Sequence, residues 1–134
     1  MPVATAWEAV GLLGSTVVAA DGQISPGTPV GSNEGYNPTT NTWAALTADA
    51  TPRLEACFAA INGQLYVAGG ANATGVLSVN EAYNANAKAW TTLASMPNAL
   101  ATAGSATAGG RLYCFGGFNS NLSSVYSYLQ IYQP

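Results

Sequence analysis

The 134-residue sequence contains no histidine, few charged residues and no long apolar run. The missing histidine excludes metal sites built on imidazole and Ser-His-Asp or Cys-His catalysis. Six acidic and three basic residues leave no basic stripe for a phosphate backbone, so no nucleic acid partner is expected. Because no run of about 18 apolar residues is present, no membrane insertion is expected either.

The N-terminal residues show no charged stretch followed by an apolar one, so no secretory signal is visible. The low charge, with abundant Ala, Thr, Asn and Gly, favours an extracellular or bacterial cell-surface location and leaves the question open. No cofactor and no metal are expected.

What the sequence does contain is a repeat with a period of 47 residues. Residues 33–43 (NEGYNPTTNTW) return as residues 80–90 (NEAYNANAKAW), and residues 62–70 (NGQLYVAGG) return as residues 109–117 (GGRLYCFGG). A strand-rich unit of about this length that ends in a glycine pair is typical of propeller blades.

Each unit is expected to fold as four short antiparallel strands. Residues 57–61 and 64–68 flank Asn62-Gly63, a dipeptide that favours a tight hairpin, and residues 77–83 and 89–93 supply the third and fourth strands. The two cysteines, Cys57 and Cys114, are not equivalent in the repeat. Free thiols packed as small apolar groups are favoured, and a bond across neighbouring blades is the alternative.

The first unit is degenerate. Residues 16–25 align with the hairpin of the second unit when Asp21-Gly22 is read as the turn and Pro26-Gly27 as the glycine pair. Residues 6–10, around Trp7, resemble the fourth strands around Trp43 and Trp90, and residues 129–134 look like a third strand. The beginning of the sequence is therefore expected to complete what the end leaves unfinished.

These patterns predict a single all-β domain of three four-stranded blades. The blade units cover approximately residues 11–46, 47–93 and 94–134, and residues 4–10 form a closing strand for a partner chain. Since closed propellers need about four to eight blades, we expect a homodimer that forms a six-bladed ring by strand exchange at the termini. The alternative is a fragment of a longer propeller.

The combination of motifs resembles the kelch repeat. The matching pieces are LYVAGG with NEAYNANAKAW, LYCFGG with YLQIYQP, and NEGYNPTTNTW followed by Pro52-Arg53. The resemblance implies a β-propeller with six or seven blades that serves as a binding platform, with ligands held by loops around the central channel. Some kelch-like proteins are copper-dependent galactose oxidases or sialic acid mutarotases, but the fold alone does not imply either activity.

Repeated polar and aromatic residues are interpreted as structural. Glu34 and Glu81 are equivalent, with Gln130 at the same place in the third unit, so hydrogen bonding to backbone or to a neighbouring blade is favoured over catalysis. The repeated Trp and Tyr residues are expected to pack between strands and blades rather than to stack on sugars.

Ligand binding is expected in the loops where the repeats differ. The candidate residues are amides, hydroxyls, one aromatic ring and two charged groups, a set that suits neutral polar ligands. They are Arg53, Glu55, Asn72, Thr74, Asn98, Asn119, Asn121 and Tyr126. For Arg53 two interpretations stand side by side, a clamp for a ligand carboxylate and a structural arginine packed between blades.

The function favoured by the sequence is a non-catalytic kelch-like binding module for a protein or a glycan. One alternative is a carbohydrate-active enzyme, such as a sugar epimerase, mutarotase or glycosidase, that uses channel Glu residues with Arg53. Another is a minimal structural or synthetic propeller without a ligand.

Overall fold

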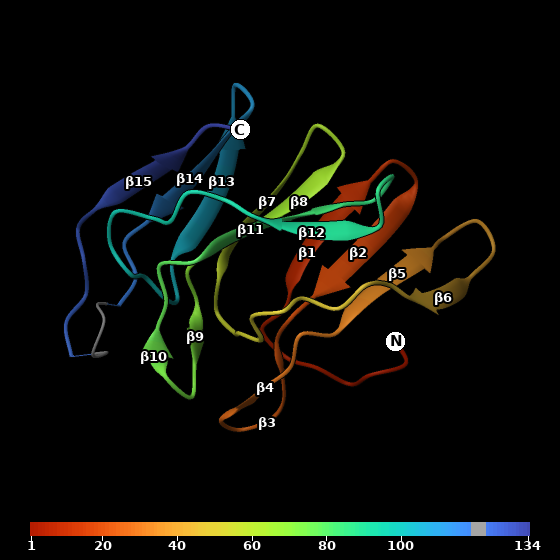
Figure 1. Cartoon of the computed structure of the whole chain (residues 1–134), viewed down its shortest axis with the longest axis horizontal. Helices are drawn as coiled ribbons and strands as arrows, with labels where there is room; N and C mark the ends of the chain where they lie inside the picture. Colours follow the sequence, from red (N-terminus) through yellow and green to blue (C-terminus); the bar gives the residue numbers. More distant parts are fainter. Residues whose placement is uncertain (119–122) are drawn as a thin grey trace.

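The computed structural model describes residues 1–118 and 123–134, which form short β-strands joined by turns and loops (Figure 1). No helix in this part of the chain is long and apolar enough to cross a membrane.

The strands form three main antiparallel sheets in chain order. Sheet 1 has the order β1-β2-β5-β6, sheet 2 the order β7-β8-β11-β12 and sheet 3 the order β13-β14-β15. Sheet 1 comprises β1 (Ala9–Leu13), β2 (Thr16–Ala20), β5 (Asn33–Asn37) and β6 (Thr42–Ala45). Sheet 2 comprises β7 (Cys57–Ile61), β8 (Gln64–Ala68), β11 (Asn80–Asn84) and β12 (Ala89–Thr92). Sheet 3 comprises β13 (Gly104–Ala108), β14 (Arg111–Phe115) and β15 (Leu129–Tyr132), so among the described residues it has three strands rather than the expected four.

Two small hairpins follow the second strands of sheets 1 and 2. They are formed by β3 (Gln23–Ser25) with β4 (Thr28–Pro29) and by β9 (Ala71–Asn72) with β10 (Gly75–Val76). Figure 1 shows both hairpins at the same end of the molecule, beyond the ends of the sheet strands. The loop that leads into each sheet forms an isolated β-bridge with the segment that follows the second strand. These bridges are Ala6↔Gln23, Leu54↔Ala71 and Ala101↔Phe118. The loops that lead into the sheets and the segments that follow the second strands therefore lie at the same end of the molecule.

The expected turn at Asp21-Gly22 was wrong. The β1–β2 hairpin turns at residues 14–15, and Asp21-Gly22 instead follows β2 in the way that Gly69-Gly70 follows β8. The backbone explains the error, because Asp21 (φ 63°) and Gly22 (φ 96°) adopt the left-handed conformations of the glycine pair (φ 70° and 90°). Aspartate is one of the few residues that tolerate this region, so a glycine pair could be replaced without a change of fold.

The expected closing strand at residues 4–10 was also wrong. Ala9 and Val10 belong to β1 and pair with β2 inside sheet 1. Trp7 has φ 63° and is equivalent to Glu55 and Thr102, both φ 58°, which precede the first strands of sheets 2 and 3. The two-residue turn lets β1 pair with the adjacent β2, and the alternate burial along β1 places one of its faces in the core between sheets 1 and 2.

Neighbouring sheets pack face to face over apolar side chains. β1 lies beside β7, and β7 lies beside β13. One core joins sheets 1 and 2 and includes Val18, Leu65 and Tyr83, with Trp90 packed against it. A second core joins sheets 2 and 3 around Tyr66 and Leu112. Sheet 2 is therefore covered on both faces, whereas sheets 1 and 3 each have one face without a neighbour among the described residues.

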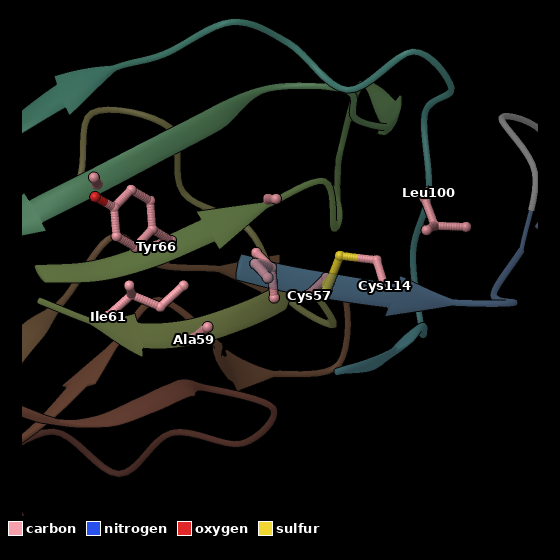
Figure 2. Packing of buried hydrophobic residues seen from close by; sticks show 9 residues of the cluster. Cys57, Ala59, Ile61, Tyr66, Leu100 and Cys114 are labelled. Carbon is pink, nitrogen blue, oxygen red and sulfur yellow. A yellow bond between two sulfur atoms is a disulfide. The ribbon is translucent and has the colours of Figure 1, made fainter. Parts of the chain in front are cut away.

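Cys57 and Cys114 form a disulfide, so the expectation of free thiols was wrong. Figure 2 shows the bond in the core between sheets 2 and 3, which also contains Tyr66 and Leu100. Cys57 lies on the face of β7 turned to sheet 3, Cys114 on the face of β14 turned to sheet 2, and their Cα atoms are 5.9 Å apart. Whether two cysteines are equivalent in the repeat does not decide whether they are bonded, because the packing of one sheet on the next brings non-equivalent positions together.

Candidate functional site

Arg53 lies at the centre of a buried charged cluster where the chain crosses from sheet 1 to sheet 2. Its side chain is fully buried. One guanidinium nitrogen, Nη2, is ion-paired with Asp49 at 2.9 Å and also with Glu81, while Nε lies 3.6 Å from Asp21 Oδ2. A buried cation of this kind requires such compensation, because an unpaired charge in the interior is strongly unfavourable.

The same guanidinium also holds the surrounding backbone. Nε donates to the carbonyl of Thr51 at 3.1 Å, and Nη1 donates to the carbonyls of Val79 at 3.2 Å and Gly69 at 3.5 Å. Of the two interpretations of Arg53, this position matches the structural arginine packed between blades. Arg53 and Glu81 do lie together, as the enzyme alternative requires, but they are ion-paired in the interior rather than presented to a channel pocket.

Asp21 is the least compensated member of this cluster. It is 2% exposed, and neither carboxylate oxygen has a hydrogen-bond partner within the described structure. Burial and the nearby negative charge of Asp49 outweigh the attraction of Arg53 and raise the pKa of Asp21 to about 9. Asp21 therefore carries a proton at neutral pH, which leaves one cation balanced mainly by two carboxylates.

The repeated polar residue of the third strands binds the crossing loops. The Glu34 carboxylate accepts a hydrogen bond from the Val3 amide at 2.9 Å. The Gln130 side chain accepts from the Asn98 amide at 3.0 Å and donates to the Asn98 carbonyl at 3.2 Å. Because Glu81 meets Arg53 at the equivalent place, the structural interpretation of these residues is confirmed.

A surface hollow of about 460 Å³ lies where the innermost strands β1, β7 and β13 begin. Its lining contains the three equivalent left-handed residues Trp7, Glu55 and Thr102. Thr102 Oγ1 donates to Glu55 Oε2 at 2.6 Å, and Trp7 is 55% exposed. The remaining lining residues are Glu8, Ala56, Phe58, Ala103 and Gly104. We call this hollow the mouth, since it lies at one end of the three innermost strands.

The mouth is acidic and partly aromatic. Glu8 and Glu55 contribute two carboxylates and Trp7 an exposed ring. Apart from buried Arg53, the only basic residues of the chain are Lys88 and Arg111, which lie at the hairpin turns. Hydroxyl, amide or ammonium groups therefore fit this surface better than anions.

Of the expected site residues that the structure describes, only Glu55 lines the mouth. Asn72 Oδ1 accepts hydrogen bonds from both the amide and the hydroxyl of Thr74, which closes the turn of the β9–β10 hairpin. Asn98 is held by Gln130, and the Tyr126 ring stacks on Tyr128 with centroids 4.5 Å apart. Asn119 and Asn121 lie outside the described residues.

Sequence reasoning missed Trp7, Glu8 and Thr102. The signal was present, because the short segments 6–8 (AWE), 54–56 (LEA) and 101–103 (ATA) each precede a first strand at the same spacing. Trp7 was compared instead with Trp43 and Trp90, because all three are tryptophans. Those two residues do lie in fourth strands, where they contact Tyr36 and Tyr83, so the packing role expected of them is confirmed.

Comparison with known proteins agrees with this architecture. The family model described as Kelch motif matches residues 52–97 and 99–129, which is more than half of the chain. The chain belongs to the kelch family. The resemblance drawn from its glycine pairs, tyrosines and tryptophans is thereby confirmed.

A solved structure, described as "Structure of YjhT", is similar to this kelch chain with a TM-score of 0.78 and 26% sequence identity. The match covers 90% of this chain and 36% of that chain, so this chain spans a little over a third of the length of its neighbour. The search of curated proteins gave no match.

Proposed function

We propose that this chain is a non-catalytic kelch-type binding module whose three sheets are propeller blades, and that two copies close a six-bladed ring. The ligand, a protein or a glycan, binds at the mouth. The observation that carries the proposal is the chemistry of the two sheet faces that lack a neighbour.

The free face of sheet 1 repeats a face that is covered in sheet 2. Val10 and Leu12 in β1 are 45% and 61% exposed. Their equivalents in β7 are Phe58 and Ala60, which pack against the core between sheets 1 and 2. Sheet 1 therefore presents the surface that sheet 2 uses to bind the sheet before it.

The free face of sheet 3 has the complementary character. Phe115 and Ile131 are 47% and 53% exposed. Their equivalents in sheet 2, Ala68 and Ala82, are each 1% exposed in the core between sheets 2 and 3. Large exposed apolar surfaces of this kind mark association sites. A second copy offers both missing faces at once, and a two-fold arrangement uses each face once per chain.

Ring closure in this form needs no exchanged strand. Residues 1–8 run along sheet 1 as residues 49–56 run along sheet 2, with Ala6↔Gln23 in the place of Leu54↔Ala71. In the proposed dimer this segment fills the junction between sheet 3 of the partner and sheet 1, and the ring is held by packing of the faces.

The proposed ligand site follows from the same arrangement. A ring of six blades places two copies of Trp7, Glu55 and Thr102 around one channel entrance. Carboxylates and a hydroxyl beside an exposed indole ring suit recognition of polar groups on a glycan or a peptide.

Light scattering tests the assembly. We expect twice the chain mass of 13.6 kDa for the parent protein and the monomer mass for Leu12→Asp and Ile131→Asp, because each places a charge in an apolar interface. Thr91→Asp, at an exposed site on β12, is the matched control and should remain dimeric. A parent protein that is monomeric at high concentration would contradict the proposal. It would fit the alternative in which further blades of a longer propeller cover the free faces of sheets 1 and 3.

Binding screens with short peptides and neutral oligosaccharides test the ligand site. Any ligand found should lose affinity for Trp7→Ala and for Glu55→Gln, while Trp43→Phe serves as a control that removes an indole elsewhere. Binding that is unaffected by both mouth substitutions would place the site in another part of the molecule.

A further inference from the structure

The acidic side chains are divided between the interior and a single place on the surface. All six lie in the part of the chain that the structure describes. Four of them are buried, namely Asp21, Glu34, Asp49 and Glu81. The other two, Glu8 and Glu55, are only partly buried, and both line the mouth. The carboxylates that solvent can reach are therefore gathered in one hollow.

The basic side chains lie away from this hollow. Arg53 is buried in the ionic cluster, Lys88 lies in the turn between β11 and β12, and Arg111 begins β14 after the turn from β13. Both turns lie at the end of the sheets opposite to the mouth, because β7, β11 and β13 all run from the mouth end to the other. The charged side chains therefore make the mouth negative and the opposite end positive, a distribution that attracts a cationic group to the mouth.

The open position of the mouth residues belongs to the repeat and not to the first sheet alone. Glu55 precedes β7 in sheet 2, which has a neighbouring sheet on each face, and it is still only partly buried and lines the hollow. Trp7 holds the equivalent place before β1 and is 55% exposed. The backbone beside it is fixed by two hydrogen bonds between Ala6 and Gln23, at 2.9 and 3.0 Å, so the fold determines where the indole ring lies.

One carboxylate of the mouth is oriented by the next sheet. Thr102 Oγ1 donates to Glu55 Oε2 at 2.6 Å, and the Thr102 amide donates to the Glu55 carbonyl at 2.9 Å. The hydroxyl thus engages Oε2, and Oε1 is the oxygen left to accept from a ligand. Carboxylate oxygens beside the exposed Trp7 ring suit a guanidinium or an ammonium group, which gains both charge-assisted hydrogen bonds and attraction to the aromatic face.

The mouth is also an open hollow. Trp7, Thr102 and Gly104 are exposed, so a bound group would keep part of its surface in water. Sites for small molecules usually enclose most of their ligand. An open site of this kind instead suits a side chain that a larger partner presents, because the rest of the partner covers the surrounding surface.

Taking the mouth as the ligand site of the proposed function, on which this step rests, we propose that it binds a basic side chain, arginine or lysine, of a protein partner. The cationic group lies over the Trp7 ring and donates to the carboxylates of Glu55 and Glu8. A neutral glycan is then not the preferred ligand.

Two capped pentapeptides are a matched pair of probes. The first is acetyl-GGRGG-amide, and in the second citrulline replaces arginine, which keeps nearly the same shape without the charge. Each is titrated into the full chain, and binding is followed through the NMR signal of the Trp7 indole N–H, which is identified by its loss in Trp7→Phe. We expect the arginine peptide to bind at least about tenfold more tightly, and the difference should shrink as salt is added.

Substitutions without a change of shape locate the charge. Glu55→Gln and Glu8→Gln should each weaken binding of the arginine peptide and leave the citrulline peptide nearly unchanged, because each removes one carboxylate charge from the mouth. Lys88→Gln is the control, since it also changes the net charge but at the opposite end of the sheets, and it should alter neither affinity.

The possible failures are distinguishable. Equal binding of the two peptides at the Trp7 signal would overturn the preference for a cation and leave the mouth as a ligand site. Arginine binding that both glutamine variants leave intact would overturn the proposal as well. A Trp7 signal that neither the peptides nor neutral oligosaccharides move would contradict the ligand site itself, together with the proposal that rests on it.

Discussion

Arg53 and Glu81 form an ion pair in which neither side chain is open to solvent. Arg53 belongs to the segment that crosses from sheet 1 to sheet 2, and Glu81 lies in β11 of sheet 2. The pair therefore fixes the crossing segment to the sheet that it enters. Asp49 and Asp21 add two further carboxyl groups to the same guanidinium.

The next junction has no charge at the equivalent positions. Met96 and Leu100 stand where the first junction has Asp49 and Arg53, and the matching sites of Glu81 and Asp21 are Gln130 and Gly69. One chain thus contains an ionic and an uncharged version of the same junction. The comparison predicts how the ionic cluster can be replaced.

Arg53→Leu alone should lower the free energy of unfolding by about 3–5 kcal/mol, because it leaves buried carboxylates without their cation. The fourfold variant Asp21→Gly, Asp49→Met, Arg53→Leu, Glu81→Gln copies the uncharged junction. We expect it to recover most of the loss in urea denaturation. A fourfold variant as unstable as the single one would show that the two junctions are not interchangeable.

Asp21 makes stability depend on pH. Since the pKa is raised in the folded protein to about 9, from 3.8, the folded state holds a proton that the unfolded state releases between these values. Its contribution is fully present below about pH 4 and is lost as the pH rises towards 9, with a slope of at most about 1.4 kcal/mol per pH unit. Asp21→Asn keeps a residue that tolerates positive φ and should remove this slope.

Urea denaturation of the Asp21→Asn and parent chains at several pH values between 5 and 9 measures the effect. The variant should gain stability over the parent as the pH rises. Parallel curves for the two proteins would mean that Asp21 is ionised in the folded state.

The Cys57–Cys114 disulfide should stabilise the docking of sheet 3. The cysteines are 57 residues apart, a loop length for which the chain-entropy account gives about 4 kcal/mol. We expect the Cys57→Ala, Cys114→Ala variant to lose stability by that order, and amide exchange to accelerate most in β13 to β15. Uniform acceleration over all three sheets would contradict a local role of the disulfide.

Local sequence patterns predicted much of the fold because they act within one sheet. Asn62-Gly63 predicted the turn between β7 and β8, and the glycine pair predicted the end of β8. The spacing from Tyr to Trp predicted paired third and fourth strands. The repeat was aligned wrongly over the first sheet for two reasons. Asp21 adopts the left-handed conformation that glycine has in the other units, and Trp7 was equated with the tryptophan of a fourth strand.

Contacts between sheets were not predictable from the repeat. The repeat relates equivalent residues, whereas packing joins non-equivalent ones, as the Cys57–Cys114 bond shows. For the same reason the mouth was found only in part, since Trp7 and Thr102 meet Glu55 through the arrangement of three sheets. The burial of Arg53 likewise depends on Asp49, Asp21 and Glu81 arriving from different segments.

Crosslinking tests ring closure by two copies most directly. The Cys57–Cys114 pair defines which positions face each other across a junction, and at the proposed junction between chains these are Gly104 of one copy and Ala19 of the other. The double variant Ala19→Cys, Gly104→Cys is therefore oxidised and analysed by non-reducing mass measurement.

The control is Ala9→Cys, Val67→Cys, which occupies the junction between sheets 1 and 2 and should form its disulfide within one chain. We expect a covalent species of twice 13.6 kDa for the Ala19→Cys, Gly104→Cys variant, and Ile131→Asp should abolish it. A chain that stays at 13.6 kDa, while the control forms its internal disulfide, would contradict closure by a second copy.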